Sequence, residues 1–330
     1  MPADPKSADP TPDASSGHSP AGHPHIEQFQ ATLPHGITLS CRAAGQRGRP
    51  VLLFLHGFPE AAFVWDAVLR HFAQPEHGGY RCVAPNLRGF EHSSSPTDVA
   101  AYRAKHLMQD VLALIALTTA DGPTPGKLAT LVAHDWGGAV AWNVAATAGQ
   151  HMGRLAIINS PHPGTFLREL QHSPEQQAAS AYMNALARPD AETRLAANDF
   201  QKMWGFFASE WGGPTPDAWL TPEVKQQYRE VWGLGLTGGL NYYRASPLRP
   251  PTESDTSVQA LTLPPELLRV QLPTLVIWGE QDRALLPSLL DGLEAYVPRL
   301  QVERLPDASH WVIHEQPARV CALLESFLAQ

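Results

Sequence analysis

Short apolar runs alternate with helical patterns along most of the chain. The runs VLLFLH (residues 51–56) and TLVIWG (residues 274–279) are apolar almost throughout, as expected for central strands that are covered on both faces. The runs that fit strands cover residues 50–56, 80–84, 128–134, 155–159, 274–279 and 301–305. Between the runs at 80–84 and 128–134, apolar residues recur at the spacing of one helical face, namely Leu107, Val111, Leu114 and Ile115. This alternation predicts a mostly parallel sheet with helices on both faces.

The strand pattern stops between residues 164 and 264, where helical segments rich in aromatic residues take over. This predicts a helical cap inserted into an α/β core, whose two parts are residues 26–163 and 265–330. Residues 1–25 are rich in Pro, Ala, Ser, Asp and His, a composition typical of a disordered tail.

Composition narrows the possible partners. Of 330 residues, 43% are apolar and 17% charged, and the net charge of −8 argues against nucleic acid as a ligand. No apolar run is long enough to cross a bilayer and no signal peptide is evident, so we expect no membrane partner and a cytoplasmic location. The three cysteines, Cys41, Cys82 and Cys321, lie far apart and predict neither disulfides nor a zinc site.

The strongest chemical signal is a strand that runs directly into a turn and a helix. LATLVAH is followed by Asp135-Trp136-Gly137-Gly138 and then by AVAWNVAATA. A nucleophile elbow requires this order, with small residues around the reactive one, and it predicts Asp135 as the nucleophile. A carboxylate that attacks a saturated carbon forms an ester that water can cleave, whereas serine would leave an inert ether. Asp135 therefore favours an epoxide or an alkyl halide as substrate.

Two further residues follow predicted strands. Asp282 follows TLVIWG and His310 follows QVERLP, in the order nucleophile, acid, base. In open α/β sheets ligands bind at the carboxyl ends of the strands, so we expect these side chains to meet there. We predict His310 as the base and Asp282 as the acid that orients it.

The segment His56-Gly57-Phe58-Pro59-Glu60 follows the first apolar strand. The backbone N–H groups of Phe58 and Trp136 are predicted to bind the oxyanion that forms when water attacks the Asp135 ester. We expect His56, Pro59 and Trp136 around the substrate pocket, and a cis peptide bond before Pro59. No motif for a nucleotide or a metal competes with these residues, so we expect no cofactor and no metal in catalysis. The expected partners are a small-molecule substrate and water, and a homo-oligomer is left open.

With these motifs, together with NSPHP at 159–163 and NYYR at 241–244, the chain resembles the epoxide hydrolases of the α/β-hydrolase superfamily from about Ile26 to the C-terminus. The resemblance implies the α/β-hydrolase fold and conversion of an apolar epoxide to a vicinal diol. It also implies two cap tyrosines, Tyr243 and Tyr182, that bind the epoxide oxygen and donate a proton. A phenol suits this task because its pKa near 10 keeps it protonated at neutral pH.

Two alternatives share part of this pattern. Haloalkane and haloacid dehalogenases use the same Asp nucleophile, but this chain carries Trp136 where fluoroacetate dehalogenases have Arg, and Phe58 where haloalkane dehalogenases have Asn. A non-catalytic ligand receptor could reuse the fold. Such a receptor has no need of a complete triad, and this sequence retains all three members.

Overall fold

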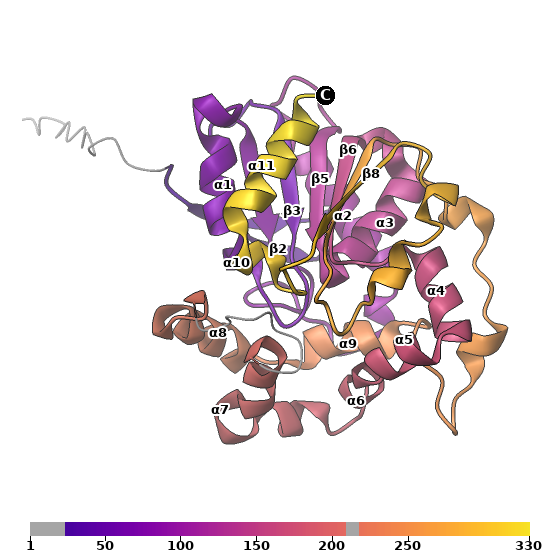
Figure 1. The fold of residues 1–330 in the computed structure, drawn as a ribbon. Helices are drawn as coiled ribbons and strands as arrows, with labels where there is room; N and C mark the ends of the chain where they lie inside the picture. Colours follow the sequence, from indigo (N-terminus) through magenta and orange to yellow (C-terminus); the bar gives the residue numbers. More distant parts are fainter. Residues whose placement is uncertain (1–23, 209–217) are drawn as a thin grey trace, which may run out of the picture.

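The computed structural model describes residues 24–208 and 218–330; the predicted tail lies, up to residue 23, outside the described residues. In the described ranges the centre is an eight-stranded sheet (Figure 1). Its strands are β1 (Glu27–Thr32), β2 (Thr38–Ala44), β3 (Val51–Leu55), β4 (Arg81–Pro85), β5 (Leu128–His134), β6 (Met152–Ile158), β7 (Thr274–Gly279) and β8 (Leu300–Leu305). The core helices are α1 (Asp66–Ala73), α2 (Ala104–Thr118), α3 (Asp135–Ala148), α10 (Val312–Glu315) and α11 (Pro317–Leu328).

The strand order is β1-β2-β4-β3-β5-β6-β7-β8, and β3 to β8 run parallel. The predicted mostly parallel sheet and all six predicted strands are therefore confirmed. The antiparallel edge formed by β1 and β2 was not predicted. In β2 half-buried residues alternate with buried ones, and in β1 half-buried or buried residues alternate with exposed ones, because a sheet edge with a solvated face has little apolar side-chain area to bury.

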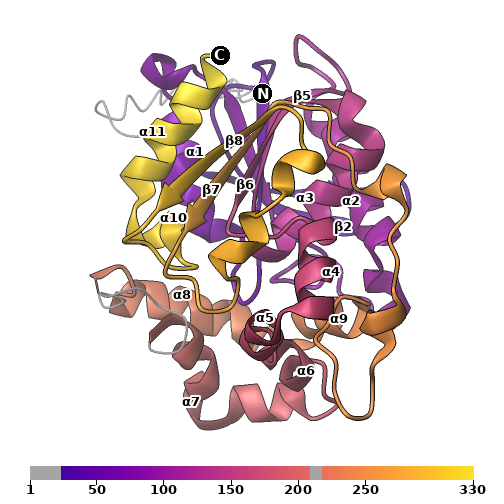
Figure 2. The ribbon, with the colours of Figure 1, turned by 45° about the vertical axis from the view of Figure 1, so that its right-hand side comes forward.

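Alternate residues of the central strands enter two separate cores. In β3, Leu53 and Leu55 pack with α2 and α3, whereas Leu52 and Phe54 pack with α1 and α11. Figure 2 shows the two helix layers on opposite sides of the sheet. The predicted apolar face of α2 is buried as expected, with Leu107, Val111, Leu114 and Ile115 inside. Burial on both faces explains why these strands read as continuous apolar runs.

The segment between β6 and β7 is mainly helical. Its helices are α4 (Pro163–His172), α5 (Pro174–Ala179), α6 (Tyr182–Leu186), α7 (Ala191–Ala208), α8 (Pro222–Gly233) and α9 (Thr237–Ala245). Non-helical dihedrals at residues 197–200 break α7 into two parts. Helices α6 to α9 lie across the carboxyl ends of the strands and form the cap (Figure 1).

The loop after β4 attaches the cap to the core. Gly89 in this loop contacts Gly238 at the start of α9 so closely that a Cβ atom on Gly238 would lie 2.2 Å from the Gly89 oxygen. The Tyr242 hydroxyl of α9 donates to the Arg88 carbonyl over 3.0 Å. The Arg88 guanidinium in turn donates two hydrogen bonds, of 2.7 and 2.6 Å, to the carboxylate of Asp110 in α2, and both side chains are only 4% exposed. The ion pair therefore holds the surface on which α9 rests.

The three cysteines are core residues. Cys41, Cys82 and Cys321 are buried and unpaired, and burial raises the pKa of the Cys41 thiol to about 12. Of the helices that the structure describes, none combines the length and the apolarity that crossing a membrane requires.

We expect Arg88→Ala to destabilise the protein by about 3–5 kcal/mol, because it leaves Asp110 buried without its main counter-ion. The midpoint of urea unfolding should fall accordingly. Arg47→Ala is the matched control, since the Arg47 side chain is 69% exposed in its pair with Glu27. Equal midpoints for the two variants would contradict an anchoring role for Arg88.

Candidate active site

The turn between β5 and α3 presents Asp135 in an unusual backbone conformation, with φ of 48°. The chain around it is packed too tightly for larger residues. A Cβ on Gly57 would lie 2.2 Å from Asp135 Oδ1, one on Gly137 would lie 2.6 Å from carbonyl oxygens near the end of β3, and one on Gly138 would lie 2.3 Å from the Cβ of Ser160. The small residues that the sequence places here are therefore required by the close approach of β3, α3 and the segment after β6.

The two carboxylate oxygens of Asp135 have different surroundings. Oδ1 accepts a hydrogen bond from the Phe58 N–H at 2.8 Å, and Oδ2 lies 3.7 Å from Nε2 of His310. The Ser160 hydroxyl donates to the main-chain oxygen of Asp135 over 2.7 Å and so supports the strained turn. Trp136 lies in the first turn of α3, where backbone N–H groups have no acceptor within the helix. The structure thus brings Asp135, Phe58, Trp136 and His310 together.

His310 and Asp282 form the other part of the candidate active site. His310 Nδ1 lies 2.7 Å from Asp282 Oδ2, and both side chains are nearly inaccessible. Asp282 also accepts hydrogen bonds from the N–H groups of Ala284 and Leu285, each at 2.9 Å, and from the Asn159 amide at 2.8 Å. The role of Asn159 was not predicted, although it begins the NSPHP motif.

The charge state of His310 depends on its neighbours. Burial by itself lowers the pKa of the imidazole, but the carboxylates of Asp282 and Asp135 outweigh it and raise the pKa to about 9. The imidazole is therefore protonated at neutral pH, and Asp282 contributes more to this than Asp135 does.

A second buried network lies behind His310. The His134 nitrogens lie 3.0 Å from Glu60 Oε2 and 2.9 Å from the His310 carbonyl oxygen. The other oxygen of Glu60 lies 2.6 Å from His314 Nε2 and accepts from the Tyr228 hydroxyl of α8 at 3.3 Å. Burial raises the pKa of Glu60, but hydrogen bonds from His134 and His314 hold it well below its usual range. Glu60 belongs to the segment HGFPE (56–60) and His134 to HDWGG (134–138), but the sequence did not indicate that they meet.

Tyr182 and Tyr243 come from separate cap helices and lie together above Asp135. Their ring centroids are 6.1 Å apart, and the Tyr243 ring stands edge-on to Trp136 at 5.0 Å. Burial and the nearby Asp135 carboxylate raise the pKa of each phenol well above 10. Both hydroxyls are therefore protonated and available as donors near neutral pH.

A cavity of about 270 Å³ separates the cap from the sheet, and Asp135, Trp136, Tyr182 and Tyr243 all line it. The rest of its wall is mainly apolar, with residues such as Leu107, Val140, Phe166, Met183, Leu248 and Leu263. A much smaller cavity of about 10 Å³ adjoins the same two tyrosines and is lined by Phe58, Pro59, Leu186, Phe206 and Trp311. The peptide bond between Phe58 and Pro59 is cis, as predicted.

His56 does not line either of these cavities, in contrast to the prediction that it belongs to the pocket. Its ring is fully buried behind the turn, where Nε2 accepts from the Leu87 N–H at 3.0 Å and Nδ1 lies 2.9 Å from the Gly57 oxygen. Burial lowers the pKa of this imidazole to about 4, so it is neutral and its contacts are structural.

Comparison with known proteins agrees with this architecture. Residues 50–317 match the family described as alpha/beta hydrolase fold. The chain is 32% identical to AB hydrolase superfamily protein YfhM of Bacillus subtilis, covering 89% of this chain and 95% of that protein. It is 31% identical to human epoxide hydrolase 4, covering 89% and 76% respectively.

Solved structures similar to this chain are also epoxide hydrolases. An epoxide hydrolase from metagenomes of hot environments superposes with a TM-score of 0.79 at 39% identity, covering 92% of this chain and 99% of that one. Bacillus megaterium epoxide hydrolase, solved with an inhibitor, superposes with a TM-score of 0.78 at 30% identity and is covered completely. The chain therefore belongs to the α/β-hydrolase-fold family, within the group of epoxide hydrolases.

Proposed function

We propose that this protein hydrolyses apolar epoxides to vicinal diols through an ester on Asp135. The observation that carries the proposal is the placement of an aspartate nucleophile and two protonated phenols in the wall of one apolar cavity. Carboxylate attack and proton donation to the leaving oxygen are the two requirements of epoxide opening. The names of the relatives support the same activity.

In the first step, Asp135 Oδ2 attacks one epoxide carbon and the bond from that carbon to the epoxide oxygen breaks. One of the two phenols, Tyr182 or Tyr243, gives its proton to the alkoxide while the other donates a hydrogen bond to it. Oδ1 stays on the Phe58 N–H and becomes the carbonyl oxygen of the ester. The product is a hydroxyalkyl ester that contains every atom of the substrate.

In the second step, a neutral His310 takes a proton from water, and the hydroxide attacks the ester carbonyl. Esterification removes the charge of Asp135, which is one of the influences that raise the pKa of His310, and the phenolate left by the first step takes up the proton that His310 carries, so the imidazole becomes neutral. The N–H groups of Phe58 and Trp136 bind the developing oxyanion. Collapse of this intermediate breaks the bond between the Asp135 carbonyl carbon and Oδ2, and the departing alkoxide takes a proton from the new carboxyl group. Oδ2 leaves with the diol, the oxygen of water stays on Asp135, and the protonated His310 and the ionised Asp135 are restored.

The shape of the site favours substrates with one large apolar substituent. The two tyrosines adjoin a cavity of about 270 Å³ and one of only about 10 Å³. A bulky group fits the first, whereas the second has room for about one group of the size of water or methyl. We therefore propose terminal epoxides, such as styrene oxide and aryl glycidyl ethers, as the preferred class.

His310→Gln should stop the reaction after the first step, because no base remains to activate water. Intact-mass measurement with styrene oxide should show an adduct equal to the whole substrate, and peptide mapping should place it on Asp135. Dehalogenation of a haloalkane would instead leave an adduct lighter by hydrogen halide. Asp135→Ala should form no adduct, and an adduct on another residue would refute the mechanism.

Tyr243→Phe and Tyr182→Phe should each slow ring opening by roughly 10²- to 10⁴-fold, the usual contribution of a positioned general acid. Tyr102→Phe is the matched control, because this tyrosine also lines the cavity but donates its hydroxyl to the Pro96 carbonyl. Single-turnover rates of ester formation would separate the three variants. If Tyr102→Phe lost as much activity as Tyr243→Phe, the assignment of the proton donor would have to change.

We expect a higher kcat/KM for styrene oxide than for trans-stilbene oxide, by at least about tenfold, because the cavity of about 10 Å³ beside the two tyrosines is too small for a second phenyl ring. Diol formation from both, measured by chromatography, tests this. Leu186→Ala enlarges the small cavity and should reduce the difference in kcat/KM between the two epoxides. Equal kcat/KM values for the two epoxides in the unmodified enzyme would contradict the proposed preference for terminal epoxides.

A further inference from the structure

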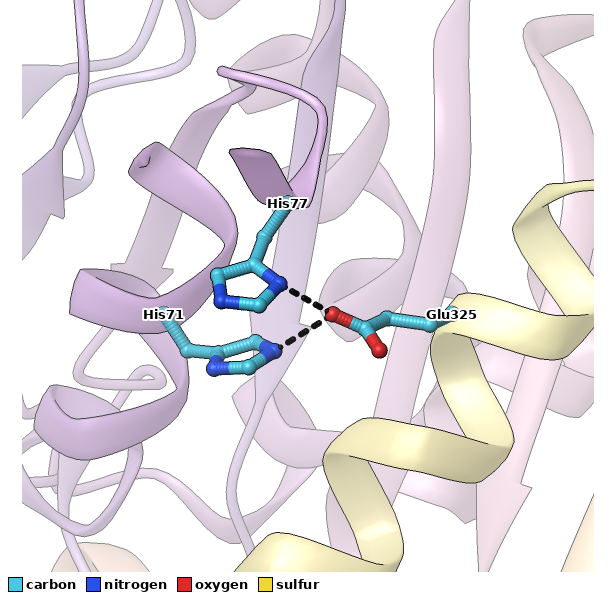
Figure 3. Close-up of side chains that lie close together, drawn as sticks. All are labelled: His71, His77 and Glu325. Carbon is cyan, nitrogen blue, oxygen red and sulfur yellow. Dashed lines mark hydrogen bonds and ion pairs between the residues drawn. The ribbon is translucent and has the colours of Figure 1, made fainter. Parts of the chain in front are cut away.

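Three side chains that could bind a metal ion lie at the end of the sheet opposite the cap. It consists of His71 in α1, His77 in the short 3₁₀ helix η2 (Pro75–His77), and Glu325 near the end of α11 (Figure 3). His71 Nε2 lies 2.8 Å and His77 Nδ1 lies 2.5 Å from the same carboxylate oxygen, Oε1 of Glu325. The active site uses none of these residues.

The two imidazoles are arranged in parallel. Their ring centroids are 3.8 Å apart with an interplanar angle of 21°, and both nitrogens point at the carboxylate, as Figure 3 shows. In the neutral form, the imidazole nitrogen that carries no hydrogen presents a lone pair to a metal ion. One divalent ion between two such nitrogens and the carboxylate would be bound by all three groups.

The three side chains need to move only a little for a metal ion to bind between them. The candidate ligand atoms all lie within 4.8 Å of one another. In a tetrahedral zinc site, bonds of about 2.0–2.1 Å place neighbouring ligand atoms roughly 3.3 Å apart. The Glu325 side chain is 37% exposed and has to move back by less than about 1 Å to reach this separation.

The chemistry of the three groups also suits a metal. Two imidazoles and one carboxylate are a ligand set used for zinc and its neighbours among the transition metals. The side chains are 26%, 31% and 37% exposed, which leaves the fourth coordination position to water.

We propose that His71, His77 and Glu325 bind one divalent transition-metal ion, with zinc as the natural choice, and that the ion clamps α1 to α11. These helices form the layer over one face of the sheet, and their ligands are 254 residues apart in the chain. An ion that joins them binds the folded state and not the unfolded chain, and so stabilises the fold. The site is structural, and diol formation does not depend on it.

The test is calorimetric titration of zinc into the full chain after treatment with a chelator at about pH 7.5. One ion per chain should bind, and zinc at about 100 times its dissociation constant should raise Tm by roughly 2–6 °C. His71→Gln, His77→Gln and Glu325→Gln should each weaken binding by at least about tenfold and abolish the shift in Tm. All three variants should retain the wild-type kcat/KM for diol formation, with and without chelator.

Two control variants test whether zinc binds at histidines outside the proposed site. The variant with His18, His23 and His25 changed to Gln and the variant with His92, an exposed loop residue, changed to Gln should both retain zinc binding and the shift in Tm. In the unmodified chain, zinc should perturb the imidazole ¹⁵N resonances of His71 and His77, which tests the proposal without any substitution. Absence of a zinc-dependent shift in Tm, its persistence in the three ligand variants, or its loss in the tail variant would overturn the proposal.

Discussion

The site depends on one steric constraint, the close approach of three backbone segments around the turn that carries Asp135. Gly57, Gly137 and Gly138 each occupy a position where a Cβ atom would overlap a neighbour. Because they have no side chains, the loop after β3 can bring the Phe58 N–H to within 2.8 Å of Asp135, and Ser160 can reach the main chain of the turn. The positive φ of Asp135 persists because these contacts determine it from several sides.

Buried charge is the second constraint, and the structure satisfies it by placing a histidine against each of two inaccessible carboxylates. Asp282 lies against His310, and Glu60 lies against His134, which contacts the His310 carbonyl oxygen. Asp282 receives hydrogen bonds from two backbone N–H groups and from Asn159, so its desolvation is compensated. Asp282 raises the pKa of His310 most strongly, and Asp135 and Glu60 add to this effect.

The cap completes the site through contacts with the core at several points. The Gly89–Gly238 contact and the Tyr242–Arg88 hydrogen bond fix α9, so that the next residue, Tyr243, stands over Trp136. At the opposite side, Trp232 of α8 donates to the Pro59 carbonyl at 2.7 Å. Apolar packing and a few directed hydrogen bonds therefore place the phenols relative to a nucleophile that belongs to a different layer of the fold.

The sequence by itself determined the parallel core and the residues Asp135, Asp282 and His310, because apolar runs identify doubly covered strands and reactive residues follow their ends. The outer strands β1 and β2, whose burial alternates from residue to residue, gave no comparable signal. Only the tertiary structure decided that His56 is buried behind the turn, that Glu60 joins His134, and that His71, His77 and Glu325 converge. Each of these outcomes depends on contacts between residues distant in the chain, and local patterns of polarity do not encode such distances.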